Sequence, residues 1–299
     1  MSLVTGFKRI LPPAVRHVAR KTLAKGSRYT QGVNKHVRRY TGVLPDFLII
    51  GSQKCGTTSL YHYLIQHSCI YPAATKEVGY FDRYYSGDLH WYRSHFPSSV
   101  HKYYQHNLLK RPFLTGEAST RYIVIPQVLR RIAHILPYTK LILLLRNPVD
   151  RAYSHYHHSR RGGQETLSFE EALQQETARI GQHWQHMRDE GVYSLEVDYY
   201  AYRRLGIYLP QVQVLLSLFP REQVVILDNE QLARRPEAVF TQVVRFLELP
   251  PWQLRHFERH NSGSYVPMAG ATRARLVEYY QPYNQALYAY LGMEFAWDR

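Results

Sequence analysis

The sequence predicts an α/β fold in which a central, mostly parallel sheet is flanked by helices. Three short apolar runs have the length of buried strands, and each is followed by a segment with helical signals. These runs lie at residues 46–50, 140–145 and 224–227. The chain has 299 residues, of which 45% are hydrophobic, so it can bury the core of one large domain or two small ones. Strands that alternate with helices form parallel sheets with right-handed crossovers.

The helices are expected from local signals in chain order. The first apolar run ends at Gly51, and after a short polar loop a helix is expected over Thr57–His67. The second run leads into Asn147, an N-cap residue type, and Pro148, which suits the first helical position, so a helix is expected to about residue 161. Further helices are expected from a capping box and from apolar spacing at residues 168–171, 199–218, 236–247 and 272–291.

Composition limits the class and location of the protein. No apolar run approaches the ~20 residues that span a bilayer, so no transmembrane helix is expected. The chain has two cysteines, Cys55 and Cys69. Two cysteines exclude a disulfide framework or a cysteine-rich zinc module and suit a reducing compartment. A cytoplasmic enzyme is therefore the expectation.

The positive charge is concentrated at the start of the chain. The net charge is +15, and residues 1–45 contain ten basic side chains and no acid. We therefore divide the chain into a basic extension, 1–45, and a domain, 46–299. The extension either is a solvated or docked segment or forms an amphipathic helix on a membrane surface or an acidic partner. The rest of the chain carries too little excess charge for a nucleic-acid-binding protein, and no nucleic acid is expected as a partner.

The loop between the first strand and its helix, residues 51–59, is suited to bind a phosphate. Backbone N–H groups and the positive end of the helix dipole converge on an anion at such a position. Gly51 and Gly56 keep the spacing of the nucleotide-triphosphate loop G-x-x-x-x-G-K-[ST], but Thr57 replaces its lysine and Lys54 lies inside the loop. An interior lysine beside a bridging oxygen suits the transfer of a sulfuryl or phosphoryl group.

Together with residues 143–154 (Leu-Leu-Leu-Arg-Asn-Pro-Val-Asp-Arg-Ala-Tyr-Ser), residues 51–60 resemble the sulfotransferases that use 3′-phosphoadenosine 5′-phosphosulfate (PAPS). Within this family, the sequence resembles the heparan-sulfate, or carbohydrate, branch most. The resemblance implies a P-loop-like three-layer fold and PAPS as the donor. It also implies three groups of donor-binding residues. These are Lys54, Cys55, Gly56, Thr57, Thr58 and Ser59 in the first loop, Arg146 and Ser154 at the 3′-phosphate, and Ser262 and Gly263 in a late loop.

The same resemblance indicates the acceptor side. Residues 75–82 (Thr-Lys-Glu-Val-Gly-Tyr-Phe-Asp) are similar to the family's Lys-Glu-x-x-x-Phe-Asp segment, whose glutamate is the proposed general base. This makes Glu77 the candidate base, opposite Lys54 on the leaving-group side, as an in-line transfer requires. His158 resembles a histidine that assists catalysis in the N-sulfotransferase branch. The residues expected to position the acceptor are Lys76, Asp82 and Glu117.

Two departures from the family pattern bear on the acceptor. Ala118 stands where glycosaminoglycan enzymes have lysine, and Gly79 stands where several have histidine. The expected acceptor is therefore a hydroxyl of a carbohydrate or a small metabolite rather than heparan sulfate itself. No metal site is expected, since His155 and His158 alone share a helix face. Two alternatives stay open: a P-loop kinase or NTPase, and a non-catalytic protein that binds anions through its basic extension.

Overall fold

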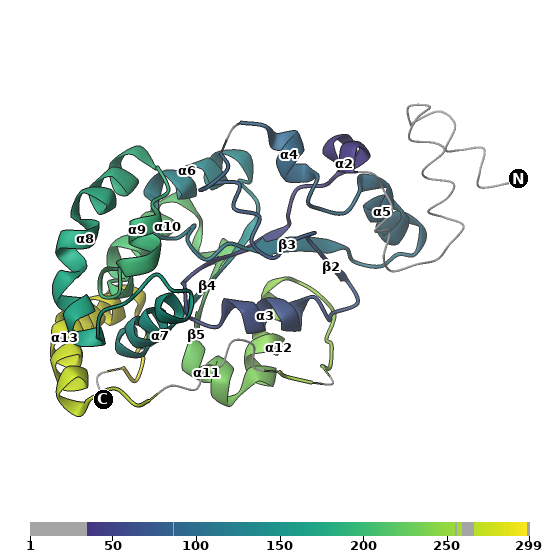
Figure 1. Ribbon diagram of the computed structural model, residues 1–299. Coiled ribbons are helices and arrows are strands. Elements are labelled where there is room, and N and C mark those ends of the chain that lie inside the picture. The colour runs from purple at the N-terminus through teal and green to yellow at the C-terminus, as the bar shows by residue number, and fades with distance from the viewer. Residues whose placement is uncertain (1–34, 86, 255, 259–265, 298–299) are drawn as a thin grey trace, which may run out of the picture.

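The computed structural model contains one sheet of five parallel strands in the order β2-β3-β1-β4-β5 (Figure 1). It describes residues 35–85, 87–254, 256–258 and 266–297. The strands are β1 (Phe47–Gly51), β2 (Ile70–Pro72), β3 (Leu114–Ala118), β4 (Lys140–Leu145) and β5 (Val224–Asp228). The predicted central parallel sheet is confirmed. Within the described part of the chain, no helix combines the length and apolar character needed to cross a membrane.

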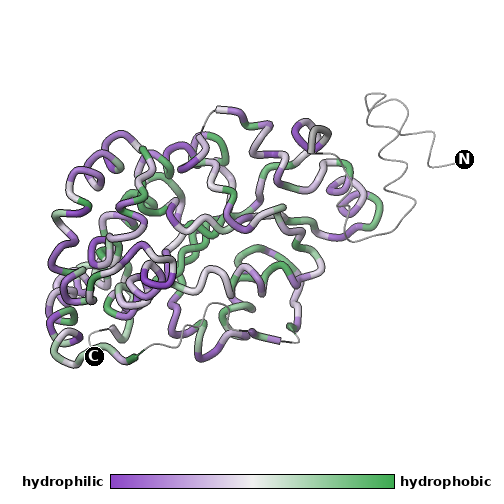
Figure 2. Tube along the Cα trace, in the orientation of Figure 1, coloured by the Kyte–Doolittle hydropathy of each residue, from purple (hydrophilic) through white to green (hydrophobic). Residues whose placement is uncertain are grey.

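The central strands are apolar along their whole length because helices cover both faces of the sheet. In β1, Leu48 and Ile50 pack into one apolar cluster, whereas Phe47 and Ile49 pack into another on the opposite face. Figure 2 shows apolar residues gathered along these strands, with hydrophilic residues on the outer turns of the helices. The sheet therefore forms the middle of three layers.

The helices divide between the two faces. The first cluster takes in α4 (Leu89–Arg93), α6 (Pro126–Ile135), α8 (Phe169–Glu190), α9 (Leu195–Tyr200), α10 (Leu209–Leu218) and α13 (Gly270–Leu291). The second takes in α3 (Thr57–Leu64), α11 (Asn229–Arg234) and α12 (Pro236–Phe246), which lie together below the sheet in Figure 1. Helix α7 (Pro148–Arg161) packs with α8 and α13 in a third cluster. The smaller elements are α2 (Lys35–Thr41), α5 (Ser99–Tyr103), the π-helix η2 (Tyr104–Leu108) and the 3-10 turns η3 (Arg204–Gly206) and η4 (Arg221–Gln223).

The helix-start signals act as expected. Asn147 caps α7, its side chain accepting a hydrogen bond from the Val149 amide at 2.9 Å. Ser168 and Glu171 form the reciprocal capping box at the start of α8. The expected continuous helix over 199–218 is instead split into α9, η3 and α10. Gly206 lies at the break, where an added Cβ would come within 2.8 Å of the Tyr280 hydroxyl.

The described end of the basic extension is attached to the domain. Helix α2 is followed by Gly42, whose carbonyl accepts a hydrogen bond from Arg93 Nε at 2.6 Å. Arg39 pairs with Asp88, the N-cap residue of α4, at 2.5 Å. Residues 38–43 therefore contact the region around α4.

Candidate active site

The donor loop runs from Ser52 to Gly56 and joins β1 to α3. Lys54 and Gly56 take left-handed backbone conformations, with φ of +67° and +88°. Gly56 also allows a close approach, because an added Cβ would lie 2.6 Å from the Asn229 amide nitrogen. No side chain caps the N-terminus of α3. The N–H groups of the first turn of α3, which Thr57 begins, point out of the start of the helix and can therefore bind an anion.

Two side chains from other elements hold this loop, and a third, Tyr208, holds Arg146. Arg146 Nη1 donates to the Lys54 carbonyl at 3.1 Å, and Asn229 Nδ2 donates to the Cys55 carbonyl at 3.0 Å. Tyr208 donates to the Arg146 carbonyl at 2.9 Å. The Cys55 side chain points into the core, where burial raises the pKa of its thiol to about 11. Cys55 can therefore contribute to donor binding through its backbone alone.

The loop lies among positive charges. Desolvation, followed by the nearby Arg161, Arg146 and Arg151, lowers the pKa of Lys54 to about 8. Among the described residues, no carboxylate forms an ion pair with Lys54 or Arg146. Unbalanced cations at a helix N-terminus favour a multiply charged anion.

Helix α7 carries the second part of the site. Arg146 lies at the carboxyl end of β4, and the half-buried Ser154 is two turns further on. His158 is exposed at the next turn, and desolvation followed by the charge of Lys54 lowers its pKa. The structure therefore brings His158 near the donor loop. His155 is buried, and its Nε2 lies 2.7 Å from the Asp198 carbonyl oxygen. No group of metal ligands occurs among the residues described.

The candidate base lies beyond β2 at the same edge of the sheet. Glu77 is partly exposed and pairs with its neighbour Lys76, the Nζ–Oε1 distance being 2.8 Å. Asp82 is buried and accepts a hydrogen bond from the Arg83 amide at 2.7 Å, and desolvation raises the pKa of its carboxyl. Lys76 and Glu77 are thus available to an acceptor, whereas Asp82 has little surface to offer.

Glu117 is not where a contact with the acceptor requires it. Its side chain is completely buried at the end of β3, and both carboxylate oxygens accept hydrogen bonds from protein donors. The expectation that it binds the acceptor directly is corrected on this ground. Ser262 and Gly263, expected at the 3′-phosphate, lie outside the described residues.

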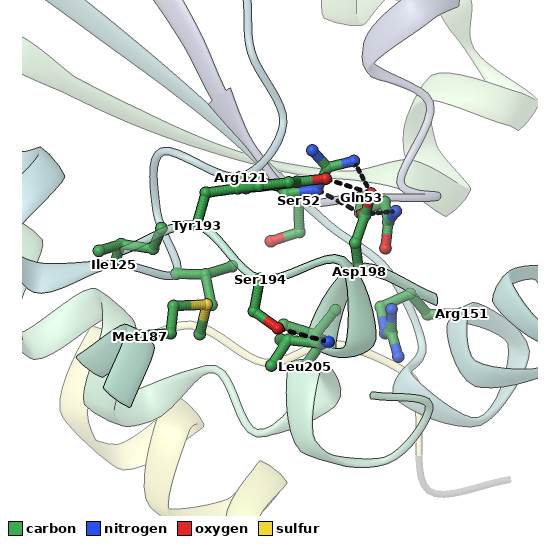
Figure 3. Close-up of a pocket in the computed structure, with 12 residues that line it drawn as sticks. Ser52, Gln53, Arg121, Ile125, Arg151, Met187, Tyr193, Ser194, Asp198 and Leu205 are labelled. Carbon is green, nitrogen blue, oxygen red and sulfur yellow. Dashed lines mark hydrogen bonds and ion pairs between the residues drawn. The ribbon is translucent and has the colours of Figure 1, made fainter. Parts of the chain in front are cut away.

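Asp198 of α9 is a site residue that sequence reasoning missed. Its buried carboxylate accepts a hydrogen bond from Gln53 of the donor loop at 3.0 Å and forms a two-point ion pair with Arg121 (Figure 3). Tyr193 donates to the same carboxylate at 2.7 Å, and the guanidinium groups of Arg83 and Arg121 both lie over its ring. Asp198 therefore connects the donor loop to the segment after β3. One acid in an amphipathic pattern gives no local signal of this role.

A small cavity lies beside this cluster. It measures about 10 Å³, room for one water molecule, and its walls include Ser52, Gln53, Arg151 and Asp198. Arg151 is fully buried and donates to the Tyr202 carbonyl. Its charge acts on Lys54 from within the fold.

A parallel α/β sheet with a cationic loop at its carboxyl edge, at the start of a helix, is the arrangement with which P-loop-like proteins bind phosphate groups. A family model described as "Sulfotransferase domain" matches residues 44–264. The chain therefore belongs to the sulfotransferase family, whose members transfer a sulfuryl group from PAPS to an acceptor. The predicted family, enzyme class and fold class are confirmed, and the kinase or NTPase alternative is not favoured.

Known proteins similar to the chain agree with this assignment. A crystal structure of a sulfotransferase from Alicyclobacillus acidocaldarius is 33% identical, with a TM-score of 0.65, and the match covers 86% of this chain and 100% of that one. The membrane-associated sulfotransferase kil1 of Dictyostelium discoideum is 26% identical over 85% of this chain and 67% of its own length. A bifunctional heparan sulfate N-deacetylase/N-sulfotransferase of Drosophila melanogaster is 32% identical over 70% of this chain, which spans only 20% of that protein.

These comparisons correct the expected location. A cytoplasmic enzyme was predicted from the cysteine content and the lack of a long apolar run. The Dictyostelium relative, matched along most of the present chain, is a membrane-associated protein. The composition of the chain is therefore no guide to its compartment, and the cytoplasmic assignment is withdrawn.

Proposed function

We propose that this chain transfers the sulfuryl group of PAPS to a hydroxyl of a carbohydrate or small metabolite. The observation that carries the proposal is the group of cations, Lys54, Arg146 and Arg161, at the uncapped N-terminus of α3. PAPS is a multiply charged anion, and such a site compensates its charge. Lysine, hydroxyl and amide groups are sufficient to stabilise the transfer, and the proposal requires no metal.

The roles of the residues follow from an in-line transfer. Lys54 neutralises the charge that grows on the 5′-phosphate as its oxygen–sulfur bond breaks. Thr57, Thr58 and Ser59 hold the oxygens of the phosphosulfate. Glu77 takes the proton of the acceptor hydroxyl while the oxygen forms its bond to sulfur. The products are a sulfate ester and adenosine 3′,5′-bisphosphate.

The 3′-phosphate distinguishes PAPS from other adenine nucleotides. Arg146, which directly follows β4, and Ser154 on α7 supply a guanidinium and a hydroxyl for this group. His158, near Lys54, assists on the donor side, and Lys76 contacts the acceptor. The late loop with Ser262 and Gly263 completes the 3′-phosphate site in this proposal.

The experiment is calorimetric titration with adenosine 3′,5′-bisphosphate without magnesium, beside ATP with magnesium and adenosine 5′-monophosphate. The bisphosphate should bind best, and Arg146→Ala should weaken it by about 10- to 100-fold, since a charge-assisted contact contributes about 1.5–3 kcal/mol. Arg245→Ala, an exposed arginine of α12, is the matched control and should bind as wild type. Stronger binding of ATP would reject the proposal. Transfer of labelled sulfate from PAPS to unsulfated heparosan and to simple alcohols then tests the acceptor class.

The basic extension has a separate proposed role, peripheral contact with an anionic membrane. Ten basic side chains without an acid in residues 1–45 support it. The full chain should bind vesicles that contain phosphatidylserine more strongly than vesicles without it. A chain that begins at residue 46 should bind both kinds of vesicle equally. Equal binding of both chains would reject this role.

A further inference from the structure

The segment that carries Glu77, residues 76–81, lies beside the segment that ends β3, residues 117–122. One main-chain hydrogen bond joins them, from the Ala118 amide to the Lys76 carbonyl at 2.9 Å. The other bonds run from backbone amides of the first segment to side chains of the second. These pairs are Val78 to Glu117 at 2.9 Å, Gly79 to Ser119 at 3.2 Å and Phe81 to the Tyr122 hydroxyl at 3.5 Å. The side chains at 117, 119 and 122 therefore hold the backbone around Glu77.

Glu117 is at the centre of this arrangement. Its Oε2 accepts from the Val78 amide and from the Ser119 hydroxyl at 2.7 Å. Its Oε1 accepts from the hydroxyls of Tyr92 at 2.8 Å and Tyr122 at 3.0 Å. All four partners are neutral donors, which suits the ionised carboxylate because it accepts only. Burial opposes that ionised form and raises the pKa of Glu117 to about 7.

A buried carboxylate without a cation beside it is costly to a fold. A neutral side chain of similar size would accept fewer of these four hydrogen bonds and leave buried donors without a partner. What the carboxylate provides is a fixed acceptor for the Val78 amide, one residue from the candidate base. Glu77 itself is partly exposed, and its ion-pair partner among the described residues is Lys76, which moves with the same backbone.

We propose that Glu117 is a positioning residue, which fixes the backbone at Val78 and thereby holds Glu77 in place to take the acceptor proton. This inference rests on the proposed role of Glu77 as base. Glu117 touches neither donor nor acceptor, since its side chain has no exposed surface. It acts through the 76–81 segment.

The test uses Glu117→Gln, which keeps the shape but replaces one acceptor oxygen with a donor. We expect kcat for sulfate transfer from PAPS to fall 10- to 100-fold. The assay uses whichever of the acceptors named above, heparosan or a simple alcohol, is sulfated fastest, or water if neither is sulfated. The affinity for adenosine 3′,5′-bisphosphate should stay within twofold of wild type. Hydrogen exchange at the Val78 amide should accelerate at least tenfold.

A matched pair of tyrosines provides the control. Tyr92→Phe removes a hydroxyl that donates to Glu117, whereas Tyr80→Phe removes a buried hydroxyl that has no hydrogen-bond partner among the described residues, from the ring stacked on Tyr92. We expect Tyr92→Phe to lower kcat 3- to 10-fold and Tyr80→Phe to leave it unchanged. Equal effects of the two variants would assign the loss to packing and overturn the inference.

A double variant separates positioning from general damage. If Glu117 acts through Glu77, Glu77→Gln with Glu117→Gln should lose no more kcat than Glu77→Gln alone. Multiplied losses, or wild-type turnover in Glu117→Gln, would overturn the inference. Full turnover in Glu77→Gln would instead refute the assignment of Glu77 as the base. Unchanged hydrogen exchange at the Val78 amide in Glu117→Gln would independently refute the positioning role of Glu117.

Discussion

The low pKa of Lys54 predicts that donor binding takes up a proton at alkaline pH. In the free protein, desolvation and the neighbouring arginines lower the pKa of this amine to about 8. A bound phosphosulfate or bisphosphate brings negative charge to the amine and restores its charged form. Above pH 8, Lys54 is mostly neutral before binding and charged after it. Affinity should therefore fall as the pH rises.

The size of this effect follows from the shift. If only the ammonium form binds, affinity falls tenfold per pH unit above the free pKa, so the loss between pH 7 and 9.5 is about thirtyfold, or about 2 kcal/mol. The phosphates of the ligand are about nine-tenths ionised at pH 7 and more at higher pH, since their second pKa is about 6. The Cys55 thiol, with a pKa of about 11, stays neutral. Lys54 is thus the loop group expected to titrate.

Calorimetry with adenosine 3′,5′-bisphosphate in buffers of different ionisation enthalpy measures both the affinity and the number of protons taken up on binding. At pH 8 we expect uptake of about half a proton per ligand bound, and almost none at pH 7. Lys54→Arg keeps a permanent charge, so its affinity should be independent of pH between 7 and 9.5. Wild-type affinity that stays constant over this range would refute the argument, as would the same decline in Lys54→Arg.

Three further predictions concern parts of the site and the fold. Asp198→Asn should cost about 3 kcal/mol of unfolding free energy in urea, because it leaves the half-buried guanidinium of Arg121 without its carboxylate partner, and should weaken bisphosphate binding through Gln53; unchanged stability would contradict a stabilising ion pair. Gly56→Ala should abolish measurable bisphosphate binding in calorimetry, since its Cβ would meet Asn229 at 2.6 Å in a left-handed conformation. Ser168→Ala should lower the unfolding free energy by about 1 kcal/mol with full donor binding, and a loss of binding would show that the cap does more than stabilise α8.

The sequence by itself determined the strands and loops that local patterns encode. Strands β1, β4 and β5 are apolar runs, because both faces of a central parallel strand are buried. The donor loop was predictable because its glycines, Lys54 and the following hydroxyls lie within one short stretch. The family assignment depended on such stretches and was confirmed. The roles of Glu77, Arg146 and Ser154 stay predictions.

The tertiary structure alone decided the features that depend on distant contacts. Strand β3 reads Leu-Thr-Gly-Glu-Ala and shows no apolar run; its buried glutamate is satisfied by donors from two other segments, at Val78 and Tyr92, and by Tyr122 of its own segment. Asp198 joins the site only because folding brings α9 against Gln53 and Arg121, which are 145 and 77 residues away in the chain. A polar side chain can be buried when partners are present to accept or donate its hydrogen bonds. Those partners are set by how helices and strands pack, and the order of residues near Glu117 or Asp198 does not reveal them.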